Sequence, residues 1–210
     1  MTIVDIHTHH RTVPHGAIIA LSPTQYDKDT PLICSLGIHP WESGHDTTQS
    51  LQLLNKLSTL PNVVAIGECG IDRLKGADIK SQTKLFEYHI QLSEEVGKPL
   101  IIHAVKSADI ILALHRQYNP SQKWIIHGYR GNATTAQQYL RRGIELSFGE
   151  KYNVEALIST PIDKLWIESD ESLVDISEIY NRVATTLDID TQVLHDSIEM
   201  RSKKIFLGCE

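Results

Sequence analysis

The sequence has little of what marks secreted, membrane-spanning or metal-thiolate proteins. Its 210 residues include only three cysteines, Cys34, Cys69 and Cys209, which are widely spaced and form no CxxC pair. Neither a disulfide framework nor a thiolate zinc site is expected, so we interpret all three as reduced thiols. No apolar run approaches the roughly 18 residues of a membrane span, and no signal-peptide pattern is visible. We therefore expect a cytoplasmic protein with no membrane contact.

Positive charge is also in short supply. The 20 lysines and arginines are outnumbered by 26 aspartates and glutamates, which gives a net charge of -6. This balance argues against a protein that coats nucleic acid by electrostatics alone, so any nucleic-acid contact must be local. With 41% hydrophobic and 22% charged residues, we expect residues 1–210 to form a single domain. Nothing in the sequence calls for an obligate protein partner.

Short β-branched apolar runs alternate with stretches of helical periodicity. The runs predict strands at 3–6, 17–21, 32–36, 63–66, 100–102, 124–126, 144–147 and 165–167. The stretches predict helices at 47–57, 78–96, 107–117, 133–141, 176–187 and 191–205, with Asn132 and Asp190 as N-caps. Strand and helix in alternation indicate a parallel sheet, and about eight strands indicate an α/β fold of the TIM-type (β/α) barrel.

The first crossover of this barrel is too short for a helix. Residues 7–16 separate the first two expected strands and show no helical periodicity. A parallel crossover needs roughly a dozen residues or more, and complete eight-fold barrels have about 250 residues. We therefore expect a trimmed or distorted barrel that lacks its first crossover helix.

Histidines and carboxylates gather at the ends of the expected strands. A lone histidine there is more often a hydrogen-bonded structural residue than a ligand, but the joint pattern matches the nitrogen and oxygen ligands of divalent ions. Six candidate ligands suit two ions about 4 Å apart, with Glu68 as the natural bridge. These candidate ligands are His7, His9, Glu68, His103, His127 and Asp170. Because two such ions can lower the pKa of a bound water and hold a phosphoryl oxygen, we expect a hydrolase.

The other histidines have simpler readings. His89, His115 and His195 fall on expected helices and are interpreted as packing or surface residues. The loop residues His10, His15 and His45 could contact substrate but are more simply solvated.

Six motifs, in order and approximate spacing, resemble those of the TatD family of metal-dependent deoxyribonucleases, which belong to the amidohydrolase-like TIM barrels. The first three segments are DIHTH at 5–9, GIHP at 37–40 and GECGID at 67–72, which are similar to the family patterns D-x-H-x-H, G-x-H-P and G-E-I-G-L-D. The other three are KPLIIH at 98–103, HGYRG at 127–131 and ESD at 168–170, which are similar to K-P-x-x-x-H, H-x-F-x-G and E-T-D.

The resemblance implies a role for each matched residue. His7, His9, Glu68 and Asp170 would hold one divalent ion, and Glu68, His103 and His127 the second. Asp170 would also orient or deprotonate the attacking water, and His39 would lie near the scissile phosphate. The metal could be zinc, manganese, nickel or magnesium.

Basic residues near these motifs are candidate phosphate contacts. Lys106 lies three residues past His103, and a solvated side chain is an equally good interpretation of it. Arg73 is a weaker candidate of the same kind. Arg130 stands where the family has a small polar residue and favours an anionic substrate, whereas Glu171 adds negative charge beside Asp170.

The leading hypothesis is a divalent-metal phosphodiesterase that acts on DNA with a two-metal-activated water, Asp170 and Glu68 being the catalytic carboxylates. The alternative is a related barrel hydrolase of a small amide, lactone or phosphoester. A non-catalytic metal-binding module is a third possibility, against which the intact Asp170 argues. Salt dependence separates the first two, because cleavage through phosphate contacts weakens steeply as salt rises.

Overall fold

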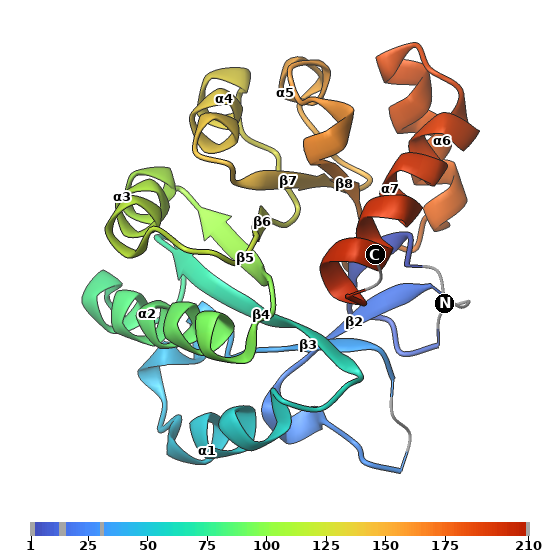
Figure 1. Ribbon diagram of the computed structural model, residues 1–210. Coiled ribbons are helices and arrows are strands. Elements are labelled where there is room, and N and C mark those ends of the chain that lie inside the picture. The colour runs from blue at the N-terminus through green and yellow to red at the C-terminus, as the bar shows by residue number, and fades with distance from the viewer. Residues whose placement is uncertain (1–2, 13–15, 30–31, 209–210) are drawn as a thin grey trace. The chain divides into compact units, whose positions relative to one another are not determined.

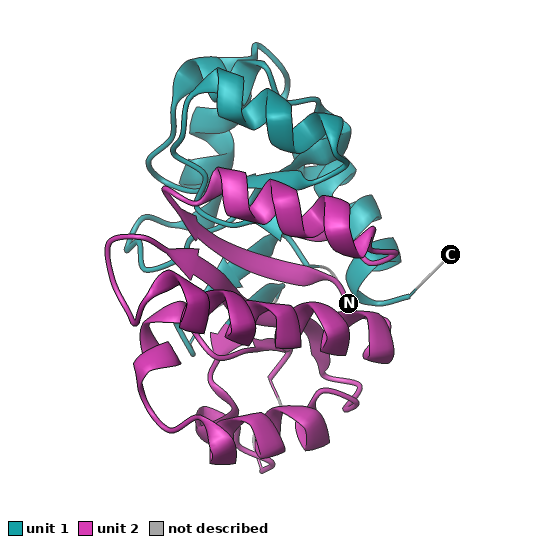
Figure 2. Ribbon diagram, turned by 90° about the vertical axis from the view of Figure 1, so that its left-hand side faces the viewer, with its two compact units in different colours: residues 1–19, 125–210 teal, residues 20–124 magenta. Residues whose placement is uncertain are grey.

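The computed structural model describes residues 3–12, 16–29 and 32–208 of the chain. The chain forms two compact units, which Figure 2 shows in different colours. Unit 1 comprises residues 1–19 and 125–210, and unit 2 comprises residues 20–124.

Unit 2 is built on parallel strands with helices beside them. Its strands are β3 (Cys34–Leu36), β4 (Val63–Asp72) and β5 (Leu100–Val105), and β4 pairs with both of its neighbours. Its helices are α1 (Thr48–Leu57), α2 (Ile79–Val96) and α3 (Ala108–Tyr118), with the short 3-10 helices η1 (Pro23–Gln25) and η2 (Pro40–Gly44). Helix α2 packs along β4 and β5, as Figure 1 shows. Phe86 of α2 is fully buried there, which is the apolar-face packing that its periodicity predicts.

Unit 1 contains both the first and the last strand of the chain. Its strands are β1 (Asp5–Thr8), β7 (Glu145–Phe148) and β8 (Leu165–Ile167), together with most of β2 (Ala17–Leu21) and β6 (Trp124–Ile126). Strand β1 pairs in parallel with β2, and β7 pairs in parallel with β6 and β8. Its helices are α4 (Ala133–Arg141), α5 (Val154–Ile158), α6 (Ile176–Leu187) and α7 (Thr191–Phe206), with the 3-10 helix η3 (Ile162–Lys164).

The strand order is the order of the chain, β1 to β8. Within unit 1, the segment after β8 also bridges in parallel to the end of β1, through Thr8 and Asp170. First and last strands that meet in this way are the mark of a barrel rather than an open sheet. Between β1 and β2, the described residues 9–12 and 16 form no helix, and residues 13–15 of the first crossover lie outside the described residues.

Most expected elements occur within one or two residues of their predicted bounds, and two expectations were wrong. Strand β4 continues to Asp72 instead of ending at residue 66, and β5 continues to Val105 instead of residue 102. The two extensions pair with each other, Gly70 opposite His103 and Asp72 opposite Val105. This pairing stabilises extended backbone where glycines and carboxylates give a low intrinsic strand propensity. Helix α5 was not predicted because it is too short for periodicity to identify.

Both of the expected N-caps are present. Asn132 and Asp190 cap α4 and α7 as expected, each accepting a hydrogen bond from a backbone amide in the first turn.

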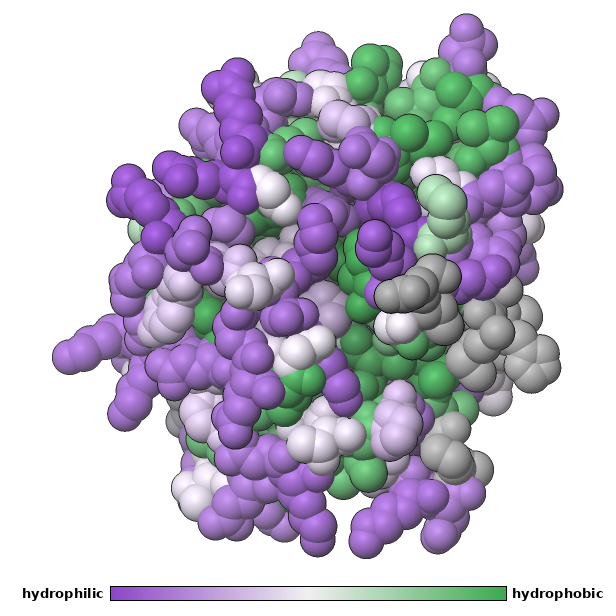
Figure 3. Space-filling model, viewed as in Figure 1, coloured by the Kyte–Doolittle hydropathy of each residue, from purple (hydrophilic) through white to green (hydrophobic). Residues whose placement is uncertain are grey.

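Cys34 and Cys69 are buried and form no disulfide, whereas Cys209 lies outside the described residues. Among the described residues, no helix is long and apolar enough to cross a membrane. Hydrophilic side chains cover most of the face shown in Figure 3, with apolar ones grouped in separate areas.

Candidate metal and active site

In unit 1, backbone hydrogen bonds hold the end of β1 against the segment that follows β8. The amide of Asp170 donates to the carbonyl of His7 at 2.9 Å, and the amide of His9 donates to the carbonyl of Asp170 at 3.1 Å. Asp170 itself has a left-handed backbone with φ of 53°. That conformation is uncommon for a residue with a side chain and is typical of functional sites, where surrounding structure maintains it.

The side chains of this segment form a group of imidazoles around one carboxylate. Nε2 of His7 and Nε2 of His9 lie 3.9 Å and 3.7 Å from Oδ1 of Asp170, so both rings of the H-x-H turn toward the same oxygen. The rings of His7 and His127 are 4.2 Å apart between centroids. His7, His127 and Asp170 each offer a ligand atom within 4.8 Å of the others. Two imidazoles and a carboxylate so arranged fit a divalent cation such as zinc or manganese.

A buried carboxylate, that of Glu168, contacts His127. Oε1 of Glu168 lies 3.3 Å from Nδ1 of His127, and the Glu168 side chain is fully buried. Burial by itself raises the pKa of Glu168, but the charge and hydrogen bond of His127 and the charge of His7 outweigh it and lower that pKa. An ionised Glu168 can therefore accept the Nδ1 proton of His127, which makes Nε2 the nitrogen that could bind a cation.

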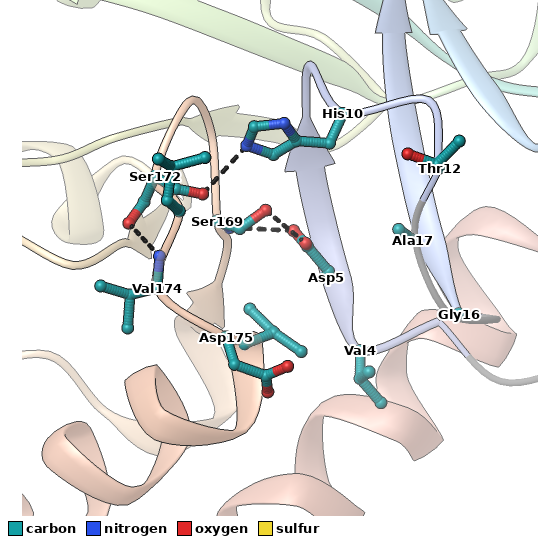
Figure 4. Close-up of a pocket in the computed structure, with 12 residues that line it drawn as sticks. Val4, Asp5, His10, Thr12, Gly16, Ala17, Ser169, Ser172, Val174 and Asp175 are labelled. Atoms are coloured by element: carbon teal, nitrogen blue, oxygen red, sulfur yellow. Dashed lines mark hydrogen bonds between the residues drawn. The ribbon is translucent and has the colours of Figure 1, made fainter.

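Asp5 joins β1 to the loop after β8. Its carboxylate accepts hydrogen bonds from the amide and the hydroxyl of Ser169 at 3.0 Å and 2.7 Å, drawn as dashed lines in Figure 4. Burial raises the pKa of Asp5 to about 7, against the effect of the Ser169 hydrogen bonds. Asp5 also lines a pocket of about 260 Å³ in unit 1, whose walls come from β1, the start of β2 and residues 172–176. His10 lines the same pocket, and its Nε2 lies 2.9 Å from the carbonyl of Ser172.

In unit 2, a second group forms around Glu68 of β4. Oε1 of Glu68 lies 2.7 Å from Nδ1 of His103 and 3.0 Å from Nε2 of His39. These three residues also offer ligand atoms within 4.8 Å of one another. The donor set is again two imidazoles and a carboxylate, which fits a divalent cation. His39, expected only near the phosphate, thus lies among the candidate ligands of this unit.

Asp72 supports this second group. Its Oδ2 lies 3.2 Å from Nε2 of His103 and accepts a hydrogen bond from the indole Nε1 of Trp41 at 2.7 Å. Burial acts to raise the pKa of Asp72, but the hydrogen bonds from Trp41, from the amide of Leu74 and from His103 lower it. Asp72 is therefore ionised and can accept the Nε2 proton of His103, in the tautomer whose Nδ1 could bind a cation beside Glu68.

Close backbone packing brings β4 and β5 together at this point. Gly70 has φ of 137°, and a Cβ atom there would overlap the carbonyl oxygen of His103. Only glycine fits at this position, which accounts for the second glycine of the GECGID segment. Next to His39 in the chain, the amide of Ile38 donates to Nε2 of His89 at 3.0 Å. His89 is fully buried, so its interpretation as a packing residue is correct.

The other expected substrate contacts are exposed. Arg130 has a 60% exposed side chain that lies 3.9 Å from Oδ2 of Asp170. Lys106 is exposed, with a left-handed backbone of φ 50°. Arg73 forms an ion pair of 2.7 Å with Asp109 and donates to the carbonyl of Lys106 at 2.8 Å. Arg73 is thus engaged within unit 2, in keeping with its weaker standing as a phosphate contact.

The remaining loop and helix histidines have structural contacts where they are described. His115 packs edge-on against Trp124, and His195 lies on α7 beside Glu199. His45 is exposed at the end of η2, and His15 lies outside the described residues.

Sequence reasoning missed the residues that support the ligands. Glu168 and Asp72 lie inside the ESD and GECGID segments but had no assigned role, and Trp41 had none either. The sequence did offer one signal, the closeness of each carboxylate to a candidate ligand. Glu168 stands two residues before Asp170, and Asp72 stands four residues after Glu68. Their contacts with His127 and His103 depend on residues 31 to 41 positions away in the chain, so they follow only from the fold.

Sequence comparisons place the chain among known proteins. The family model described as TatD related DNase matches residues 5–193. The uncharacterized metal-dependent hydrolase YabD of Bacillus subtilis is 30% identical over 148 residues, which are 66% of this chain and 58% of that protein. A 3'-5' ssDNA/RNA exonuclease TatD of a Rahnella species is 26% identical over 144 residues, 64% of this chain and 55% of that protein. The chain thus aligns with a little over half the length of these curated relatives.

Solved structures give the same result for the fold. The crystal structure of YJJV, a TatD homolog from Escherichia coli, is 17% identical with a TM-score of 0.82 and covers 97% of both chains. The crystal structure of a TatD family hydrolase from Entamoeba histolytica is 16% identical with a TM-score of 0.79, covering 100% of this chain and 99% of that one. The expected TIM-type barrel fold is confirmed. Because the family model matches nine-tenths of its length, the chain belongs to the TatD-related DNase family.

Proposed function

We propose that the protein is a divalent-metal-dependent phosphodiesterase that cleaves single-stranded nucleic acid, with DNA as the main substrate. The observation that carries this proposal is the pair of imidazole and carboxylate groups, His7, His127 and Asp170 in unit 1 and His39, Glu68 and His103 in unit 2. Membership of the TatD-related DNase family supports it, as does the exonuclease name of one relative.

Six residues would hold two divalent ions. His7, His9, Glu68 and Asp170 would bind one ion and Glu68, His103 and His127 the second, as the family resemblance implies. When bound, such ions supply Lewis acidity toward a phosphoryl oxygen and toward the attacking water. The proximity of His39 to Glu68 and His103 makes His39 a further candidate ligand.

The chain's own residues then have distinct tasks. Asp170 orients the attacking water and accepts its proton at a carboxylate oxygen, a task that suits a side chain only partly exposed. Glu168 and Asp72 keep His127 and His103 in one tautomer each, so that neither ring has to reorient during a reaction. Arg130, whose exposed guanidinium lies 3.9 Å from Oδ2 of Asp170, would contact a phosphate oxygen. His39 and Lys106 are further candidates for such contacts.

The test is cleavage of a labelled single-stranded DNA oligonucleotide by the metal-loaded protein, beside Asp170→Asn and at two salt concentrations. Asparagine keeps the volume and the tolerance of a left-handed backbone, so this variant should fold normally. We expect cleavage by the wild type, a loss of at least about a hundredfold in the variant, and suppression by salt. Metal binding without any cleavage of DNA would contradict the proposal.

A second candidate function is hydrolysis of a small phosphoester, amide or lactone. The net charge of -6 favours it, because a long polyanion is repelled by the chain as a whole. Turnover of such a substrate should depend little on salt if it is neutral, whereas DNA cleavage should fall as salt rises. A rate on small substrates that exceeds the rate on oligonucleotides and is insensitive to salt would favour this function.

A further inference from the structure

Trp41 is the exposed tryptophan of the chain. Its exposed fraction is 43%, whereas Trp124 and Trp166 are 1% and 0% exposed. It follows His39 by two residues at the start of η2. Its ring centroid lies 4.6 Å from that of His39 and 5.9 Å from that of His103. A large aromatic surface is therefore open to solvent beside the candidate ligands of unit 2.

Hydrogen bonds hold both the indole ring and the backbone of Trp41. Its Nε1 donates to Oδ2 of Asp72 at 2.7 Å, and the Trp41 amide donates to Nδ1 of His39 at 3.2 Å. Asp72 is itself buried and contacts His103. The ring is thus held in place by the carboxylate that contacts His103, so Trp41 itself loses little further conformational freedom when a ligand binds it.

A lysine covers one face of this ring. Nζ of Lys75 lies 3.6 Å from the ring centroid, in a cation–π contact. The backbone under Lys75 is well anchored, since the buried Gln82 side chain donates to the carbonyls of Asp72, Lys75 and Ala77. Lys75 is exposed, and its long flexible side chain can leave the ring at small cost because exposed cation–π contacts contribute only about 0.5–1 kcal/mol.

We infer that Trp41 is a stacking platform for a base of single-stranded nucleic acid, next to the phosphodiester that is cleaved. The inference rests on the proposed function and adds how the strand is held. A base takes the place of the Lys75 ammonium over the indole face, and the ammonium then meets a phosphate oxygen of the strand. Stacking suits an acidic chain, because it depends on the π-face of the base and not on positive charge. Every base has such a face, so the platform tolerates any sequence.

The experiment compares two probes on three proteins. One probe is a short oligo(dA), and the other is a strand of the same length in which tetrahydrofuran spacers replace the bases. The proteins are the metal-loaded wild type, Trp41→Phe and Trp41→Leu. Trp41→Phe keeps an aromatic ring but loses the hydrogen bond to Asp72, whereas Trp41→Leu loses both. The measurements are KM and kcat for cleavage, together with the salt dependence of KM.

The wild type should show a KM about tenfold or more lower for oligo(dA) than for the abasic strand. Trp41→Phe should keep most of this preference, and Trp41→Leu should lose it while still cleaving both probes. A merely structural role of Trp41 predicts instead that the two variants change KM for both probes by the same factor. Lys75→Gln should reduce the salt slope of log KM by about one for both probes.

A spectroscopic readout checks the contact directly. Iodide quenches only exposed indoles, so quenching of the wild type reports Trp41, because Trp124 and Trp166 are buried. In the Asp170→Asn variant, in which turnover should be at least about a hundredfold slower, oligo(dA) should protect Trp41 from iodide and the abasic strand should not. Equal protection and equal KM for the two probes would overturn the stacking inference while leaving the nuclease function intact. Cleavage of neither probe would overturn the proposed function, and the stacking inference with it.

Discussion

The Oδ2 atom of Asp72 lies 3.2 Å from Nε2 of His103, whose other ring nitrogen lies 2.7 Å from Glu68. One imidazole thus lies between two carboxylates, each within hydrogen-bond distance of one ring nitrogen. In the tautomer whose Nε2 proton is held by Asp72, Nδ1 is the nitrogen that could bind a cation together with Glu68.

Asp72→Asn should weaken metal binding and activity together. The variant keeps the size of the side chain but removes the charge that holds the Nε2 proton of His103. Losses of about 10- to 100-fold are typical when such a partner of a ligating histidine is changed. The measurement is metal affinity by competition with a chromophoric chelator, beside the rate. Asp109→Asn, which removes a surface partner of Arg73, should leave both quantities unchanged.

Glu168→Gln should have the corresponding effect in unit 1. The substitution removes the buried charge that lies 3.3 Å from Nδ1 of His127, so that this ring is no longer restricted to one tautomer. We expect the rate to fall about 10- to 100-fold, with a near-native far-ultraviolet circular dichroism spectrum. An unchanged rate and metal affinity would show that His127 does not depend on Glu168.

Gly70→Ala should destabilise the protein severely. The new Cβ would overlap the His103 carbonyl, and the backbone has φ of 137°. Steric overlap and strain together should cost about 3 kcal/mol or more in the free energy of unfolding. The control is Gly97→Ala, which also has a positive φ of 69° but no neighbouring atom within 4 Å. This control should cost only about 1 kcal/mol, measured by urea unfolding.

Stability should fall as the pH drops from about 6.5 to 4, in part because of His89. Burial lowers the pKa of His89 to about 4, and the hydrogen bond to the Leu85 carbonyl opposes this only in part. Between the folded pKa and the unfolded value of about 6.5, the unfolded chain binds the proton and the folded chain does not. The stabilising contribution of neutral His89 is therefore complete above about 6.5 and is lost toward pH 4.

The expected loss from His89 is about 3 kcal/mol in the free energy of unfolding over this range. His89→Gln can still accept from the Ile38 amide, and it should flatten the pH dependence of urea unfolding between pH 6.5 and 4. His45→Gln, at an exposed position, should leave that dependence as it is. A wild type whose stability does not change over this range would contradict the assignment of His89 as a buried neutral residue.

The fold could be predicted where apolar runs end at turns, and less well where pairing extends a strand. The bounds of β2, β6 and β8 agree with their apolar runs. The extension of β4 through Asp72 could not be foreseen, because its glycines and carboxylates disfavour strands and only pairing with β5 maintains it.

The candidate ligands could be proposed from the sequence because each stands in a short motif near a strand end, and they remain a prediction. Their supporting residues could not, since Glu168 and His127 follow β8 and β6, two strands that are separated by β7 and whose ends meet only in the folded chain. The exposure of Trp41 and its cation–π contact with Lys75 also depend on how two loops pack against each other. Motifs identify which side chains carry the chemistry, and the fold decides which neighbours tune them.

The most direct test of the central claim is the number of divalent ions bound per chain in the wild type and in His103→Ala. Protein dialysed against manganese and analysed by mass spectrometry of the metal should contain two ions per chain. His103→Ala should retain one ion and lose most of the affinity for the other, and cleavage should fall with it. A wild type that binds no more than one ion, or a variant that loses both ions equally, would contradict the assignment of these residues to two metal sites.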